Sequence, residues 1–202
     1  MIIRLWMEKT GPMIFLSHLE LMKTLERSFL AGGVKLVHSQ GYNPRPHMNF
    51  ALPLAVGVAA KSVILELELR ESNDFSKVSL PRGLRIVDYK EVEKGPFLMS
   101  KVRSATYKIE GEIEKLARLE GSEALSYKRK NKRGRIKERD ARDFILSYEI
   151  KEDYLDLHLK AGSQANLKPA ELLEVLLGDK DLVHSYDITL LDVFGENMES
   201  LW

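Results

Sequence analysis

The sequence predicts an α+β fold built from two ferredoxin-like βαββαβ halves with antiparallel sheets. Alternation of apolar and polar residues, which is typical of strands, recurs in both halves of the chain. Amphipathic segments with helix start and stop signals lie between these stretches, so the order β-α-β-β-α-β occurs twice. We therefore expect two domains, 1–97 and 104–202, each with its own sheet, which meet near residues 96–103.

The first half begins with a predicted strand and a well-marked helix. Residues 2–8 alternate between inward and outward positions, which predicts the strand. Ser17 and Glu20 have the spacing of a capping box, which predicts a helix start, and Gly32-Gly33 ends that helix. The remaining elements of this half are expected as strands over 49–58, 62–69 and 84–92, with a short helix start over 74–78.

The second half repeats this order after Gly95-Pro96. Pro169 and Gly178 mark the start and end of its best-defined helix, in keeping with the preferences of proline and glycine at helix ends. The elements expected here are a strand over 104–113, a helix over 114–125, a hairpin of 144–150 with 154–159, a helix over 170–177 and a strand over 184–194.

Composition excludes several classes of protein. The chain has 202 residues, no cysteine and a formal net charge of +1. The lack of cysteine excludes disulfides, thiolate catalysis and iron–sulfur or zinc sites made from cysteines of this chain. No apolar run reaches the ~20 residues that span a bilayer, and the N-terminal residues lack the apolar core of a signal peptide. We therefore expect a cytoplasmic protein without a membrane partner.

Basic residues concentrate in one segment, 128–139, which holds eight lysines or arginines and one acid. The rest of 101–202 carries a net charge of −9, so this segment is a local patch. Clustered cations neutralise a nucleic-acid backbone, which predicts phosphate contacts that position RNA without reading its sequence. A solvated loop is the alternative interpretation. The candidate phosphate contacts are Lys128, Arg129, Lys130, Lys132, Arg133 and Arg135.

The stretch 39–57 carries the main candidate site. It contains three prolines, which hold it extended and stiff, and it leads into an apolar run that we expect to be buried. A rigid loop of this kind can hold polar groups against a ligand, although a plain connector is the alternative. The candidate binding residues in it are Tyr42, Asn43, Arg45 and His47.

His18 extends this candidate site, because it follows Ser17 at a helix start, where free N–H groups favour anions. We expect His18, Arg45 and His47 to converge on a phosphate or carboxylate, with Tyr42 stacking on a base. General acid–base chemistry by His18 or His47 is a second interpretation, because imidazole titrates near neutral pH. No nucleophile–base–acid set and no metal-ligand spacing is present, so we predict no catalytic residue, metal or cofactor.

Two long segments, LSHLELMKTLERSF and SQGYNPRPHMNFALPLAVGV, resemble the radical-SAM-associated domain family, whose members are joined to or encoded beside cobalamin-binding radical SAM proteins. Weaker similarity continues in IKERDARDFILSYEI and LKPAELLEVLLG. The chain departs from the family pattern at Arg45, at His47 and at Lys61-Ser62, where an acidic residue is common. The residues that match the pattern are Ser17, His18, Leu19, Glu26, Arg27, Gly41, Tyr42, Asn43, Pro44 and Pro46, and Arg27 thereby joins the candidate binding residues.

The resemblance implies an accessory module that presents a substrate to a separate radical SAM protein. The chain lacks the cysteines of a radical SAM cluster motif, so it is not itself such a catalyst. RNA would suit the basic segment and the two ferredoxin-like halves. Three hypotheses follow: a non-catalytic RNA-binding or substrate-presenting module, a metal-independent endoribonuclease, and a docking domain for a radical SAM partner.

Overall fold

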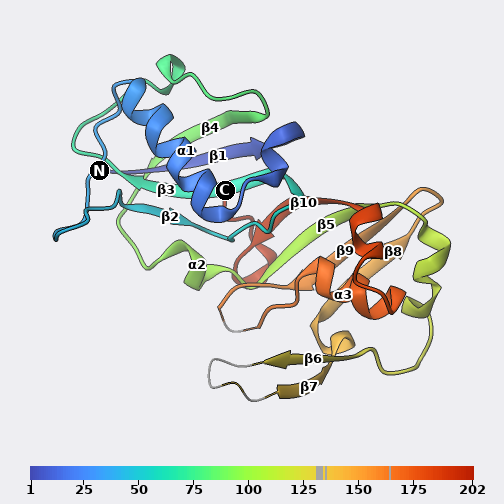
Figure 1. Cartoon of the computed structure of the whole chain (residues 1–202). Coiled ribbons are helices and arrows are strands. Elements are labelled where there is room, and N and C mark those ends of the chain that lie inside the picture. Colours follow the sequence, from blue (N-terminus) through green and yellow to red (C-terminus); the bar gives the residue numbers. More distant parts are fainter. Residues whose placement is uncertain (131–133, 135, 164) are drawn as a thin grey trace.

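The computed structural model describes residues 1–130, 134, 136–163 and 165–202 (Figure 1). It is an α+β protein with one mostly antiparallel eight-stranded sheet and few helices. The strands run in the order β4-β1-β3-β10-β5-β9-β8, and β2 also pairs with β3. Their bounds are β1 (Ile2–Lys9), β2 (Met48–Phe50), β3 (Val58–Glu68), β4 (Leu84–Val92), β5 (Ser104–Glu110), β8 (Ile145–Ile150), β9 (Tyr154–Lys160) and β10 (Asp187–Phe194).

Each half of the chain contributes four strands in the same spatial order. In the first half the order is β4-β1-β3-β2, and in the second it is β10-β5-β9-β8. All pairs within a half are antiparallel. If only the strands of this sheet are counted, the fourth strand of each half is followed in space by the first, the third and the second.

The two halves share one sheet, which differs from the separate sheets expected from the sequence. β10 pairs in parallel with the start of β3, from Ile188↔Val58 to Leu190↔Ala60. The expected strand over 49–58 is reduced to Met48–Phe50, which pairs only with residues 65–67 of β3. The start of β3 is therefore left without a partner on that edge, and β10 takes the position.

Helices pack on the sheet through regular apolar stripes. α1 (His18–Ala31) begins at the predicted capping box, in which the backbone N–H of Glu20 donates to Ser17 Oγ at 3.3 Å and the Ser17 N–H donates to Glu20 Oε2 at 2.8 Å. It buries Leu21, Leu25 and Phe29, and Figure 1 shows it lying across β1 and β3. The other helices are α2 (Leu98–Lys101) and α3 (Pro169–Leu177). None of the helices in the described part of the chain is long and apolar enough to cross a membrane.

The helix expected over 114–125 is instead a 3₁₀ turn, Ile113–Leu119, followed by an irregular segment. Arg142 favours this irregular path, because its guanidinium donates to the backbone carbonyls of Arg118, Leu119 and Gly121, which would accept intrahelical hydrogen bonds in a helix over 114–125. After this segment β6 (Ser126–Lys130) and β7 (Ile136–Asp140) form a separate two-stranded hairpin.

Candidate functional site

The proline loop, residues 39–47, projects from the first half just before β2 and is closed at its base by backbone hydrogen bonds. The N–H of Ser39 donates to Arg45 O, and the N–H of His47 donates to Val37 O, both at 2.8 Å. Tyr42 is fully exposed, and Asn43 and Arg45 are exposed beside it. Figure 1 shows this loop extending to the left of the sheet. The tip is therefore presented to solvent and does not fold back onto the helix.

His18 does not meet the proline loop. Its ring lies edge-on against Phe50, with the ring centroids 4.8 Å apart. Phe50 ends β2, whereas the proline loop precedes that strand, so His18 and the loop tip lie towards opposite ends of β2. Burial, together with the nearby charge of Lys9, lowers the pKa of His18 below its ordinary value. The structure therefore does not bring His18 together with Arg45 and His47, as the sequence predicted.

Lys9 is a buried cation that the sequence analysis missed. It is completely buried at the end of β1, and its Nζ donates to the carbonyls of Ile14 at 3.1 Å and Leu16 at 3.3 Å. Burial lowers its pKa to about 8. Its position in the inward row of β1 is the signal that could have identified it, because that row is otherwise apolar.

Arg27 lies apart from these groups. It is exposed on α1, where the neighbouring Glu26 pairs with Nε2 of His38 at 3.5 Å. It does not line the groove described next.

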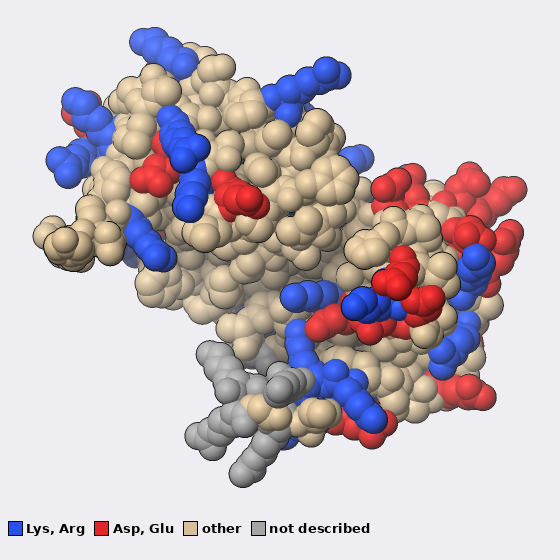
Figure 2. All heavy atoms as spheres, in the orientation of Figure 1, with Lys and Arg blue, Asp and Glu red and all other residues tan. Residues whose placement is uncertain are grey.

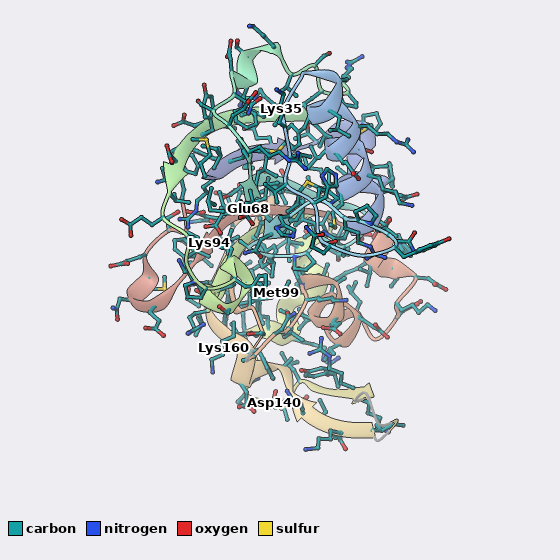
Figure 3. The ribbon with its side chains drawn as sticks, turned by 90° about the vertical axis from the view of Figure 1, so that its left-hand side faces the viewer. Lys35, Glu68, Lys94, Met99, Asp140 and Lys160 are labelled. Atoms are coloured by element: carbon teal, nitrogen blue, oxygen red, sulfur yellow. The ribbon has the colours of Figure 1, made fainter. Side chains whose placement is uncertain are left out.

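A groove of about 530 Å³ lies at the base of the proline loop. Its walls come from the entry to β2, the end of β3 and the segment that joins β4 to α2. Figure 3 shows Glu68 and Lys94 next to each other on this face of the molecule. The lining residues are Ile2, Pro46, His47, Met48, Asn49, Glu66, Glu68, Lys94, Gly95, Pro96 and Phe97.

Both carboxylates in the groove are paired with cations. Nδ1 of His47 donates to Oε2 of Glu68 at 2.8 Å, and Nζ of Lys94 donates to Oε1 of the same residue at 3.0 Å. These two contacts, with the His47 hydrogen bond the larger cause, lower the pKa of Glu68. Glu66 forms an ion pair with Arg4, in which Nη2 of Arg4 lies 2.6 Å from Oε1 of Glu66. With His47 as a neutral imidazole, the charges of Arg4 and Lys94 balance the two carboxylates, so the groove is close to electrically neutral, with a mostly apolar lining.

Phe97 is a largely uncovered part of this lining, since 77% of its surface is exposed. Sequence reasoning found His47 but missed Asn49, Glu68, Lys94 and Phe97. A signal for Phe97 was present, because an aromatic residue directly after Gly95-Pro96 lies in a turn, where it has little chance to be buried.

The family match covers most of these elements. A family model described as "Uncharacterized protein conserved in bacteria (DUF2344)" matches residues 3–169, from β1 to the first residue of α3. The chain belongs to the DUF2344 family. No curated protein matches the chain. The family description names no activity and no partner, so association of this DUF2344 chain with a radical SAM protein stays a prediction.

The basic segment of the DUF2344 chain forms part of the β6–β7 hairpin. Lys128 is exposed and lies opposite Glu138 in the hairpin register. Arg129 instead donates to Asn166 O at 2.6 Å and contacts the Glu171 carboxylate at 3.3 Å. Lys130 ends β6, and Lys132, Arg133 and Arg135 lie outside the described residues.

Charge is unevenly distributed around this hairpin. Figure 2 shows lysine and arginine side chains beside the hairpin and acidic side chains over the opposite end of the second half. Among the described residues, no group of three histidine or acidic side chains is arranged to hold a metal ion. Of the predicted phosphate contacts whose side chains are described, Lys128 is available to a ligand, whereas Arg129 is already held by α3.

Proposed function

We propose that this DUF2344 chain is a non-catalytic accessory module that binds single-stranded RNA and presents it to a radical SAM partner. The two halves, which order their four sheet strands in the same way, would provide the scaffold. Fold alone does not define function, so the proposal depends on the side chains at the surface.

The observation that carries the proposal is the pairing of exposed aromatic rings with exposed cations at one end of the first half. Tyr42 is fully exposed on the same loop as Arg45, and Phe97 is 77% exposed three residues after Lys94. Proteins that hold single strands combine rings for base stacking with cations for the backbone, and this arrangement supplies both.

The β6–β7 hairpin adds a second cationic element. Lys128 is exposed on β6, and Lys137 and Arg139 are exposed on β7. Figure 1 shows the hairpin extending to the left from the second half, below the proline loop. Contacts from such a hairpin would neutralise phosphates and position the strand, without selecting a base.

The radical SAM partner is proposed from the resemblance of the proline loop and α1 to radical-SAM-associated domains. Because the chain has no cysteine, the cluster chemistry would come from the partner. The DUF2344 chain would contribute the substrate-binding surface, which its exposed rings and cations would form.

Fluorescence anisotropy with a labelled single-stranded RNA tests the RNA proposal, and a salt series separates phosphate contacts from stacking. We expect wild-type chain to bind, and Tyr42→Ala with Arg45→Ala to weaken binding roughly tenfold, with an unchanged melting temperature. A matched double change of an exposed ring and an exposed cation elsewhere, Phe15→Ala with Lys23→Ala, should leave affinity nearly unchanged. Wild-type chain that fails to bind RNA at low salt would show that the proposal is wrong.

One observation favours a second candidate, a metal-independent endoribonuclease. The contact of 2.8 Å between His47 and Glu68 matches the arrangement in which a carboxylate orients a general base. Incubation of RNA with the chain in the presence of a chelator tests it. Cleavage that disappears in His47→Gln would establish this candidate in place of a non-catalytic module.

A further inference from the structure

The groove below Phe97 suits an uncharged planar group better than a phosphate. Its two carboxylates are each paired with cations, Glu66 with Arg4 and Glu68 with both His47 and Lys94. With His47 as a neutral imidazole, Arg4 and Lys94 balance the two carboxylates, so the electrostatic attraction of the groove for an anion is weak. Sequence reasoning predicted an anion pocket around His47, and the pairing of His47 with Glu68 argues against an anion at that position.

The apolar lining gives such a group a surface on which to stack. Pro46 and Met48 come from the entry to β2, and Pro96 and Phe97 come from the segment before α2. A phenylalanine that is 77% exposed beside an apolar groove keeps a large hydrophobic surface in contact with water. Stacking of a planar ring against Phe97 would remove that surface from water.

Polar groups within reach of this surface can recognise the edge of a base. The amide of Asn49 lines the groove and makes no hydrogen bond to any of the described residues, so both its donor and its acceptor are open to a ligand. Glu66 also lines the groove, and its Oε1 takes both contacts from Arg4, so Oε2 can accept a further N–H. Acceptors at this position favour a base that carries an exocyclic amino group.

Lys94 offers a contact for a phosphate at the rim of the groove. Its side chain is 75% exposed, and one contact to Glu68 leaves further N–H donors facing solvent at the rim. The volume of about 530 Å³ lies within the range of ~300–1,000 Å³ that is usual for small-ligand sites. A nucleotide in a single strand combines an uncharged base with a charged phosphate. The base would lie inside the groove and the phosphate would contact Lys94 at its rim.

We infer that this groove binds one unpaired nucleobase of an RNA strand, with Phe97 as the stacking ring and Asn49 and Glu66 reading the base edge. Adenine, cytosine and guanine fit this site better than uracil, because the carboxylate of Glu66 accepts from an amino group and repels the O4 carbonyl of uracil. The inference rests on the proposed RNA-binding function and adds to it the place and chemistry of one base contact.

The test compares short labelled homopolymers of adenosine, cytidine and uridine by fluorescence anisotropy, with wild-type chain and three variants. We expect adenosine and cytidine strands to bind several-fold more tightly than uridine strands. Phe97→Ala should weaken binding roughly tenfold. Glu66→Gln should reduce the preference for adenosine and cytidine strands over uridine strands. Phe15→Ala is the matched control, because Phe15 is also exposed, at 68%, but does not line the groove.

The outcomes separate the two proposals. RNA binding by wild-type chain that is unchanged in Phe97→Ala, or that shows no preference over uridine, overturns the base site and leaves the RNA-binding function in place. A wild-type chain that binds none of the strands overturns both. If Glu66→Gln proves unstable because Arg4 loses its partner, Asn49→Ala provides the second variant, and an unchanged affinity in it also counts against the inference.

Discussion

The ammonium group of Lys9 lies within the core and donates to the backbone carbonyl of Ile14 at 3.1 Å. A second carbonyl, that of Leu16, accepts at 3.3 Å. Lys9 thereby ties the end of β1 to the chain that leads into α1. The contact holds the 3₁₀ turn Gly11–Phe15 against the sheet and places the start of α1 over it.

The pH dependence of stability should reveal this buried group. Folded Lys9 releases its proton at a pKa of about 8, below its ordinary value of 10.5. Between these values the unfolded chain binds more protons at this residue, so stability rises as pH increases from about 8 to 10.5. We expect the free energy of unfolding of wild-type chain to gain ~3 kcal/mol over that of Lys9→Met across this window, measured by urea denaturation. Parallel profiles for the two chains would show that the pKa of Lys9 is not lowered.

Lys128 and Arg129, which are neighbours on β6, should behave differently. Arg129→Gln breaks contacts to Asn166 O and Glu171, so we expect it to lower the free energy of unfolding by ~1–2 kcal/mol. Lys128→Gln should leave stability unchanged and reduce both the RNA affinity and its dependence on salt. Thermal melts and salt-dependent anisotropy measure the two effects. Loss of RNA affinity in a fully stable Arg129→Gln would contradict this assignment.

Removal of the carboxylate of Glu68 should strengthen RNA binding. Glu68 pairs with both His47 and Lys94, so Glu68→Gln removes a negative charge that competes with phosphate for Lys94. We expect a several-fold increase in affinity at low salt, and a steeper salt dependence, because one more cation becomes available. Titration calorimetry at two salt concentrations checks this. Weaker binding in a folded variant would indicate that Glu68 itself contacts the ligand.

Arg142 should be a major contributor to the stability of the second half. Its guanidinium donates to four backbone carbonyls, those of Arg118, Leu119, Gly121 and Glu123. Arg142→Met leaves these acceptors without their donor, so we expect a loss of ~2 kcal/mol or more in the free energy of unfolding. Arg27→Met, on the exposed face of α1, should change it by less than about 0.5 kcal/mol. Equal stability of the two variants would show that the contacts of Arg142 are dispensable.

Local patterns determined the elements whose signals lie close together in the sequence. The capping box at Ser17 and Glu20 was correctly predicted, as was the helix between Pro169 and Gly178. The hairpin of β8 with β9 was also predicted, because alternation on both sides of a short turn is a local signal. The helix over 114–125 was wrong, and three carbonyls that it would use, those of Arg118, Leu119 and Gly121, accept from Arg142, which lies outside that segment.

The sequence by itself determined the class of fold and most strands, because backbone propensity and side-chain period act over a few residues. Only the tertiary structure decided which residues meet. Contacts between residues far apart along the chain decide three features. These are the pairing of β10 with β3, the hydrogen bond of His47 to Glu68, and the separation of His18 from the proline loop. Such contacts follow from the arrangement of strands in the whole sheet, and a period-2 pattern shows which face a side chain is on but not which strand lies beside it.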